Sequence, residues 1–141
     1  MLHELIYVSL ATRPMTAEDV QDILETSRRN NEARGITGIL LYSGRTQEFM
    51  QLLEGDHRTL DELTQVISDD DRHDRMEVIY RGGIEHRSFE NWSMAFRDLA
   101  ELDPNGLEGY STFFTDGFMK SLGSGPTNIA RSMLEHIGHQ L

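Results

Sequence analysis

The order of the apolar segments along the chain constrains its fold more than any other feature. Two stretches with apolar residues at helical spacing, 17–31 and 57–68, alternate with five apolar stretches of strand length. The strand-length stretches are residues 3–10, 36–43, 47–54, 76–82 and 91–97. This β-α-β-β-α-β-β order predicts an α+β, ferredoxin-like fold, with one sheet and both helices on one of its faces.

Local signals define the ends and faces of these elements. Thr16 opens a capping box at the start of the first helix, and Gly35 is placed to end that helix. In the last strand-length stretch, Trp92, Met94 and Phe96 recur at every second position. This period predicts that the three side chains share one face of a strand.

The composition changes after residue 99. Residues 103–106 have the composition of a linker, and 107–120 and 126–139 predict two short helices. The second of these carries an apolar stripe made of Ile129, Met133, Leu134 and Ile137. We therefore expect one domain over residues 1–98, followed by a two-helix segment over 99–141.

Composition excludes several classes of function. The chain has 24 acidic and 13 basic residues, a net charge of −11, which argues against nucleic-acid binding. The chain has no cysteine, so thiol catalysis, cysteine zinc sites and disulfides are excluded. There is no apolar run long enough to span a membrane and no basic region of a signal peptide. We expect a cytoplasmic protein that does not bind membranes.

Four polar residues fall at positions that the pattern places inside. Asn30 and Asn31 end the core-facing stripe of the first helix, Gln51 lies in a central strand, and Tyr7 lies in the middle of the first strand. Each also has a purely structural explanation: helix capping for the asparagines, a core hydrogen bond for Gln51, and ordinary packing for Tyr7. Together they could line a pocket between the helices and the sheet. Such a pocket suits a flat heterocycle rich in carbonyl and imide groups, because side-chain amides donate and accept at once.

The charged run 69–75 predicts a loop and allows two further interpretations. Its aspartates could suggest a metal site, but Arg72 and Arg75 oppose a cation there, so a solvated turn is favoured. The same arginines could hold a phosphate group. The histidines show no metal-ligand spacing, and no glycine-rich phosphate loop or hydrolase motif is present.

Six further segments carry information when read together. They are Leu5-Ile6-Tyr7-Val8-Ser9, Arg29-Asn30-Asn31, Gly35 to Tyr42, Phe49-Met50-Gln51-Leu52-Leu53-Glu54-Gly55, Asp70 to His73, and Phe89-Glu90-Asn91-Trp92-Ser93-Met94. In their order and spacing, these segments of residues 2–98 resemble the BLUF family, blue-light sensors that use a flavin. The turn 44–47 is a residue or two longer than the usual hairpin of that family.

The resemblance implies a role for each matching position. It makes Tyr7 the photoactive tyrosine and Gln51 the glutamine that switches, with Trp92 and Met94 as the pair that can exchange near Gln51. Asn30 and Asn31 would hold the polar edge of the flavin ring. The positions that would pack around the flavin are Ile23, Ser27, Phe49 and Ile67, and those near its ribityl and phosphate tail are Asp70, Arg72 and His73. The cofactor would be FAD or, alternatively, FMN.

The resemblance also implies a mechanism and an output. Light would drive an electron and a proton from Tyr7, the proton passing through Gln51, and Gln51 would be left rotated, tautomerised or both. The two C-terminal helices would cap the sheet face opposite the flavin and signal to a protein partner or within a homo-oligomer. Residues 99–141 are too few for a cyclase, phosphodiesterase or DNA-binding domain, so we expect a light sensor and no enzyme.

Two rival functions stay open at this point. A flavin-binding or protein-interaction module of the same fold could have lost its light response, although the intact Tyr7 and Gln51 argue against this. A small hydrolase of the acylphosphatase kind would need an arginine in a backbone phosphate cradle. Arg13 follows the first strand, but no glycine-rich cradle accompanies it.

Overall fold

A five-stranded sheet forms the centre of the protein, with helices on both of its faces. The computed structural model describes residues 1–102, 116–124 and 129–138. The strands are β1 (Leu2–Ala11), β2 (Thr37–Ser43), β3 (Glu48–Asp56), β4 (His73–Gly83) and β5 (Ala95–Asp98). The helices are α1 (Ala17–Arg34), α2 (His57–Ser68), the short 3-10 helix η1 (Leu99–Glu101), α4 (Phe118–Ser124) and α5 (Ile129–Gly138).

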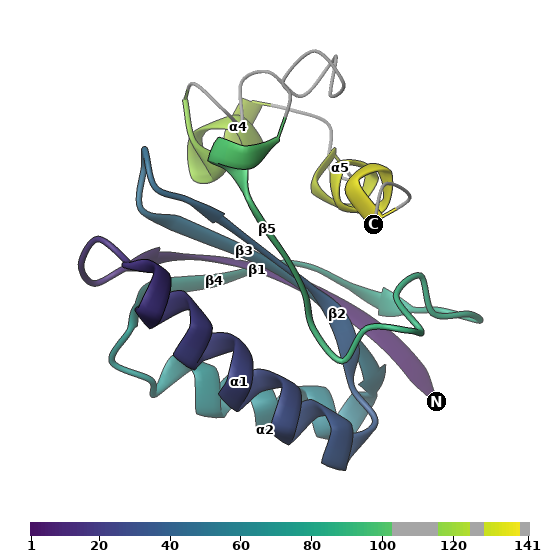
Figure 1. The fold of residues 1–141 in the computed structure, drawn as a ribbon. Helices are drawn as coiled ribbons and strands as arrows, with labels where there is room; N and C mark the ends of the chain where they lie inside the picture. The colour runs from purple at the N-terminus through teal and green to yellow at the C-terminus, as the bar shows by residue number, and fades with distance from the viewer. Residues whose placement is uncertain (103–115, 125–128, 139–141) are drawn as a thin grey trace.

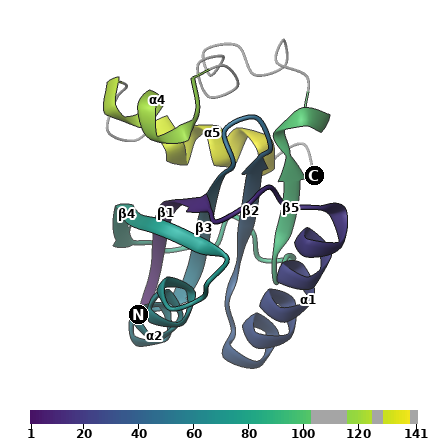
Figure 2. The same cartoon turned by 90° about the vertical axis from the view of Figure 1, so that its left-hand side faces the viewer.

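The sheet confirms the predicted α+β architecture. Its strand order is β4-β1-β3-β2-β5, in which β1 pairs antiparallel with β3 and β4, β2 pairs antiparallel with β3, and β5 pairs parallel with β2. Helices α1 and α2 cover one face, and α4 and α5 lie over the other (Figure 1). Turned by 90°, the molecule shows α1 and α2 set apart across the width of the sheet (Figure 2).

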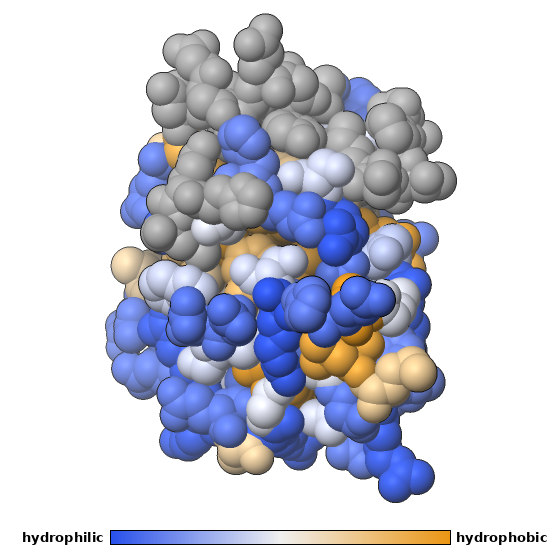
Figure 3. Space-filling view, turned by 90° about the vertical axis from the view of Figure 1, so that its right-hand side faces the viewer, coloured by the Kyte–Doolittle hydropathy of each residue, from blue (hydrophilic) through white to orange (hydrophobic). Residues whose placement is uncertain are grey.

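Strand alternation produces two separate cores. In β3, Phe49 and Leu53 belong to the core between the sheet and α1 and α2, whereas Met50 and Leu52 belong to the core beneath the C-terminal helices. Because both faces of the sheet are covered, the central strands are apolar with little alternation. On the outside, hydrophilic residues cover most of one face of the molecule, with a smaller apolar area among them (Figure 3).

Helix α1 begins and ends where the sequence predicts a cap, although it is longer than predicted. The Thr16 side chain accepts from the Asp19 amide at 3.1 Å, and the Asp19 carboxylate accepts from the Thr16 amide at 2.9 Å. At the other end, Gly35 adopts φ 69°, a left-handed conformation that glycine tolerates best. The predicted end at residue 31 was wrong, because the helix continues for another turn to Arg34.

Two other predicted segments differ from the structure. Strand β4 begins at His73, so the charged run 69–75 is only partly a loop. Strand β5 begins at Ala95, so Trp92 and Met94 precede it and do not share a strand face with Phe96. The reason is a group of bends before Ala95, which period-two spacing alone does not reveal.

The C-terminal segment contains two helices in its described part. Helix α4 runs to Ser124, four residues beyond the predicted end, while predicted helical residues 107–115 lie outside the described residues. Helix α5 covers most of the second predicted helix, and residues 126–128 and 139 lie outside the described part. Met133, Leu134 and Ile137 are buried, as the apolar stripe predicts. The division at residues 98 and 99 stays a prediction.

Buried carboxylates on the sheet hold the two C-terminal helices. Glu48 of β3 accepts hydrogen bonds from the amides of Phe118 at 2.8 Å and Met119 at 2.9 Å, in the first turn of α4. Glu4 of β1 accepts from Nε of Arg131 in α5. Both carboxylates are almost fully buried, so each requires these partners to offset the loss of hydration.

Replacing Glu48 with alanine should therefore loosen α4 and destabilise the fold. Because two charge-assisted hydrogen bonds are lost, we expect the free energy of unfolding to fall by about 2–3 kcal/mol. Urea unfolding measures this change, and hydrogen exchange should be faster at the amides of Phe118 and Met119. The control is Glu62→Ala, because the Glu62 side chain is 62% exposed; its effect should stay below about 0.5 kcal/mol. Equal stability of the two variants would contradict the expectation.

Candidate functional site

A cavity lies between α1, α2 and the sheet. The cavity volume is about 60 Å³, well below the range of about 300–1,000 Å³ typical of small-molecule sites. Nine residues singled out in the sequence line it: Tyr7, Ile23, Ser27, Asn30, Asn31, Gln51, Ile67, Asp70 and Arg72. Four residues that sequence reasoning missed also line it: Thr26, Leu40, Leu63 and Val66.

Three of the four missed residues follow from the elements that carry the others. Thr26 precedes Asn30 by four positions, and Leu63 precedes Ile67 by four, so each lies one turn away on the same helix face. Leu40 lies directly opposite Gln51 in the pairing of β2 with β3. Helix periodicity could have identified the first two, whereas Leu40 required knowledge of the strand register.

Tyr7 and Gln51 meet at the inner end of the cavity. They lie directly opposite each other in the antiparallel pairing of β1 with β3, although 44 positions separate them in the chain. Both are buried, with exposed fractions of 1% and 3%. The Tyr7 hydroxyl donates to Oε1 of Gln51. On the other side of the amide, Nε2 of Gln51 donates to the sulfur of Met94 at 3.2 Å.

The surroundings of Tyr7 keep its phenol protonated. Burial, with a smaller contribution from the Asp70 carboxylate, raises the pKa of Tyr7 far above its ordinary value. A neutral phenol beside an amide oxygen is a stable donor at neutral pH. Its proton becomes strongly acidic once the ring loses an electron, so this pair is suited to transfer of a proton coupled to transfer of an electron.

The two asparagines differ in their environment. Asn31 is 1% exposed, and its Nδ2 donates to the carbonyl of Ser93 at 2.7 Å. Asn30 is exposed, so its predicted core position was wrong, but it still lines the cavity. Adjacent helix residues point about 100° apart, so only one of them can face the sheet. The Asn31 side chain does not cap the helix; its main-chain carbonyl accepts from Ile36 at 2.9 Å.

Asp70 and Arg72 form an ion pair at the rim, in the turn after α2. Nη2 of Arg72 donates to Oδ2 of Asp70 at 2.6 Å, and Nε donates to Oδ1 at 3.0 Å. Because this arginine neutralises the aspartate, the pair does not form a cation site; within the described residues no cluster of three histidine, aspartate or glutamate side chains could hold a metal ion. The side chain of His73 lies outside the described part.

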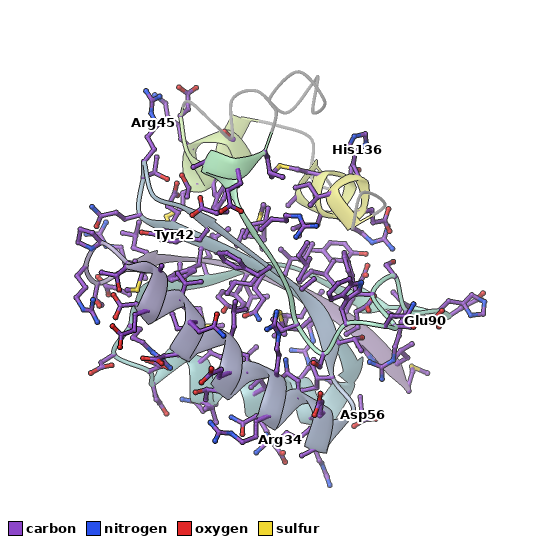
Figure 4. All side chains as sticks on the ribbon, viewed as in Figure 1. Arg34, Tyr42, Arg45, Asp56, Glu90 and His136 are labelled. Atoms are coloured by element: carbon purple, nitrogen blue, oxygen red, sulfur yellow. The ribbon has the colours of Figure 1, made fainter. Side chains whose placement is uncertain are left out.

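Met94 and Trp92 have opposite orientations. Met94 is 1% exposed and contacts Gln51, whereas Trp92 is 41% exposed. The structure therefore shows the arrangement with methionine next to the glutamine. Phe49 is fully buried and packs against Tyr42, with ring centroids 5.1 Å apart. It belongs to the core behind the cavity and not to its lining. Tyr42 lies at the end of β2 near the start of α1 (Figure 4).

Comparison with known proteins assigns the chain to a family. The family described as sensors of blue-light using FAD, BLUF, matches residues 2–95, about two thirds of the chain. The chain belongs to the BLUF family. The dark-state structure of BlrB, a BLUF protein, is 32% identical with a TM-score of 0.79, and the alignment covers 99% of this chain and 97% of BlrB.

Other relatives carry the BLUF domain within larger proteins. Photoactivated adenylate cyclase subunit alpha of Euglena gracilis is 36% identical over 95 residues, which are 66% of this chain and 9% of that protein. A bacterial light-regulated adenylyl cyclase is 27% identical with a TM-score of 0.75, covering 96% of this chain and 39% of that one. The chain thus spans about a tenth of the length of the curated relatives it matches.

BLUF domains bind a flavin, and the side chains that line the cavity suit that group. Its walls are apolar on both helices, at Ile23, Leu63 and Ile67, which suits the faces of a flat ring. At its inner end, the Gln51 amide gives one hydrogen to a sulfur atom, a weak acceptor, so it retains donor capacity toward a carbonyl.

The described part of the chain contains no helix of sufficient length and apolarity to cross a membrane.

The raised pKa of Tyr7 should be visible in the pH dependence of stability. The unfolded chain releases the phenol proton near pH 10, whereas the folded chain retains it, so high pH favours unfolding. The contribution of the buried phenol to the free energy of unfolding is therefore complete below about pH 10 and is lost as the pH rises above that value. Between about pH 8 and 11, the wild type should lose about 1.4 kcal/mol more unfolding free energy than Tyr7→Phe. Urea unfolding at both pH values measures this, and parallel losses in the two proteins would contradict it.

Proposed function

We propose that the chain is a reversible blue-light sensor in which Tyr7, Gln51 and Met94 form the switch beside a non-covalently bound flavin. Membership of the BLUF family provides the flavin and the response to blue light. The observation that carries the residue assignment is the buried relay from the Tyr7 hydroxyl through the Gln51 amide to the Met94 sulfur. Tyr7 and Gln51 line the cavity, Met94 lies beside Gln51, and all three side chains are buried away from bulk water.

The cavity residues suggest how a flavin would be held. Asn31 and Asn30 would bind the polar edge of the ring, and Ile23, Ser27 and Ile67 would pack around it. Arg72, paired with Asp70 at the rim, would lie near the ribityl and phosphate tail, and the resemblance adds His73 to that group. Phe49 would support the ring from the core behind. FAD is the proposed form, since the family description specifies it.

When bound, the flavin supplies absorption of blue light and an acceptor for one electron. The chain supplies the proton transfer. The Tyr7 hydroxyl is positioned to pass its proton to Oε1 of Gln51, and burial excludes water from that path. Gln51 can then rotate or change tautomer, because its amide both donates and accepts. A rotated amide would turn its Nε2 toward Tyr7 and its oxygen toward Met94. The hydrogen bond that Nε2 now donates to the Met94 sulfur would then be lost.

The absorption spectrum tests the assignment. The purified protein should show a flavin band that shifts slightly to the red after blue light and recovers in darkness. Tyr7→Phe removes the proton and electron donor, and Gln51→Leu removes the relay, so each variant should keep the colour and lose the shift. A band that never shifts in the wild type would instead favour a light-inactive flavin-binding module. The absence of any flavin band after addition of FAD or FMN would reject the proposal.

The output would pass through the segment that joins β4 to β5. Its Met94 contacts Gln51, while its Phe89 is packed in the core beneath α5 together with Met133, Leu134 and Ile137. A change at Gln51 could therefore reach the C-terminal helices without crossing the sheet. The receiver we propose is a protein partner or a second copy of this chain, and the role is sensory and not catalytic.

Light-minus-dark hydrogen exchange tests this route. We expect faster exchange after illumination in residues 90–98 and in α4 and α5, because release of Met94 weakens the packing of Phe89. Helix α2 is the internal control and should change less. Unchanged exchange throughout residues 90–141 would exclude this route while leaving the photochemical assignment intact.

A further inference from the structure

Met94 contacts Gln51 without the support of a strand. Residues 84–94 between β4 and β5 form bends and turns, and β5 begins only at Ala95. This segment extends beyond the sheet near Glu90 (Figure 4). A buried methionine in such a segment keeps its place only if the surrounding main chain is fixed. The contacts that fix it are therefore part of the switch geometry.

Hydrogen bonds to the sheet hold residues 88–92 of this segment. The buried Glu54 carboxylate accepts from the amide of Ser88 at 2.6 Å and from the amide of Phe89 at 3.0 Å. The amide of Gly38 donates to the carbonyl of Trp92 at 3.1 Å. These bonds anchor the segment up to Trp92, but they do not reach Met94 itself.

Side chains of α1 hold residues 93 and 94, next to Gln51. Nδ2 of Asn31 donates to the carbonyl of Ser93 at 2.7 Å, and Nε of Arg28 donates to the carbonyl of Met94 at 3.0 Å. Arg28 and Asn31 are three positions apart, so they lie on the same helix face. Arg28 is thus a side chain that binds the main chain of Met94 directly. It is partly buried, and its guanidinium is always charged, which strengthens the bond to a carbonyl.

We propose that Arg28 is a positioning residue of the light switch: by holding the main-chain carbonyl of Met94, it keeps the Met94 sulfur against the Gln51 amide. This inference rests on the proposed function of Gln51. Arg28 itself does not line the cavity. It acts on the relay through Met94.

The geometry provides a matched pair of variants. Glutamine carries its Nε2 after the same three carbons that precede Nε in arginine, so Arg28→Gln retains a donor at the required place and removes the charge. Arg28→Met has similar length and no donor. Arg28→Ala is a second loss variant, since alanine favours helix formation. Arg29→Met is the control, because Arg29 is the exposed neighbour on α1 and points about 100° away.

The first measurement follows the Met94 methyl group in the dark, in the flavin-loaded full chain. Methyl-labelled methionine gives one NMR signal per residue, and Met94→Leu identifies the signal of interest. We expect Arg28→Gln and Arg29→Met to leave that signal in place. Arg28→Met and Arg28→Ala should move it toward the position of an exposed methionine. Acrylamide quenching of Trp92, the single tryptophan of the chain, should change in the same two variants only.

The second measurement is the rate of dark recovery after blue light. Because Met94 must return to its place against Gln51, loss of one net hydrogen bond should slow recovery about fivefold in Arg28→Met. Arg28→Gln should recover at nearly the wild-type rate. An unmoved Met94 signal in both loss variants would overturn the proposal, as would equal effects of Arg28→Met and Arg29→Met.

The two proposals fail separately. If the wild type shows no light-induced shift, the proposed function fails, while the Met94 signal in the dark still decides whether Arg28 holds that residue. If the wild type responds to light but the Met94 methyl signal does not move in Arg28→Met and Arg28→Ala, only the positioning role fails. A loss of melting temperature shared by Arg28→Gln and Arg28→Met, with the Met94 signal unmoved, assigns Arg28 a purely structural role and overturns the proposal.

Discussion

The register between β1 and β3 is the constraint on which the rest of the structure depends. It places Tyr7 directly opposite Gln51 on the cavity side of the sheet. Because strand side chains alternate, the same register sends Met50 and Leu52 to the other face, where the C-terminal helices pack. A slip of one residue would exchange the two faces. The apolar side chains on the two faces of β3 belong to different cores. The register that packs both cores is therefore the register that places Tyr7 opposite Gln51.

Several buried polar groups in these apolar cores each hold a particular segment of the chain. Glu48 and Glu4 hold the C-terminal helices, and Glu54 holds the segment between β4 and β5. Burying a carboxylate is costly unless donors bind it, so each of these contacts favours the arrangement that supplies its donors. The cavity side follows the same rule: Asn31 and Gln51 are almost fully buried, and each binds a group in the segment that carries Met94. The pocket and the helical cap are thereby connected to a common segment.

Much of the fold could be predicted because its signals are local. The capping box at Thr16 and the glycine at position 35 mark a helix, and alternation of helices with strands predicts the layer arrangement. The site was predictable in part, since polar residues at apolar positions indicated Tyr7, Asn31 and Gln51. The prediction failed for Asn30, whose exposure depends on helix rotation, and for the shared face of Trp92 and Met94. Local periodicity does not reveal that β5 begins after both residues.

The sequence by itself determined the order of elements, the apolar faces and the small set of buried polar side chains, because these follow from residue type and spacing. Only the tertiary structure decided that the Tyr7 hydroxyl meets Gln51, that Met94 and not Trp92 contacts that amide, and that Arg28 binds the main chain of Met94. These contacts join residues 43 to 66 positions apart, so they depend on strand register and on the path of an irregular segment. Both are set by packing of the whole domain, which no local stretch of residues encodes.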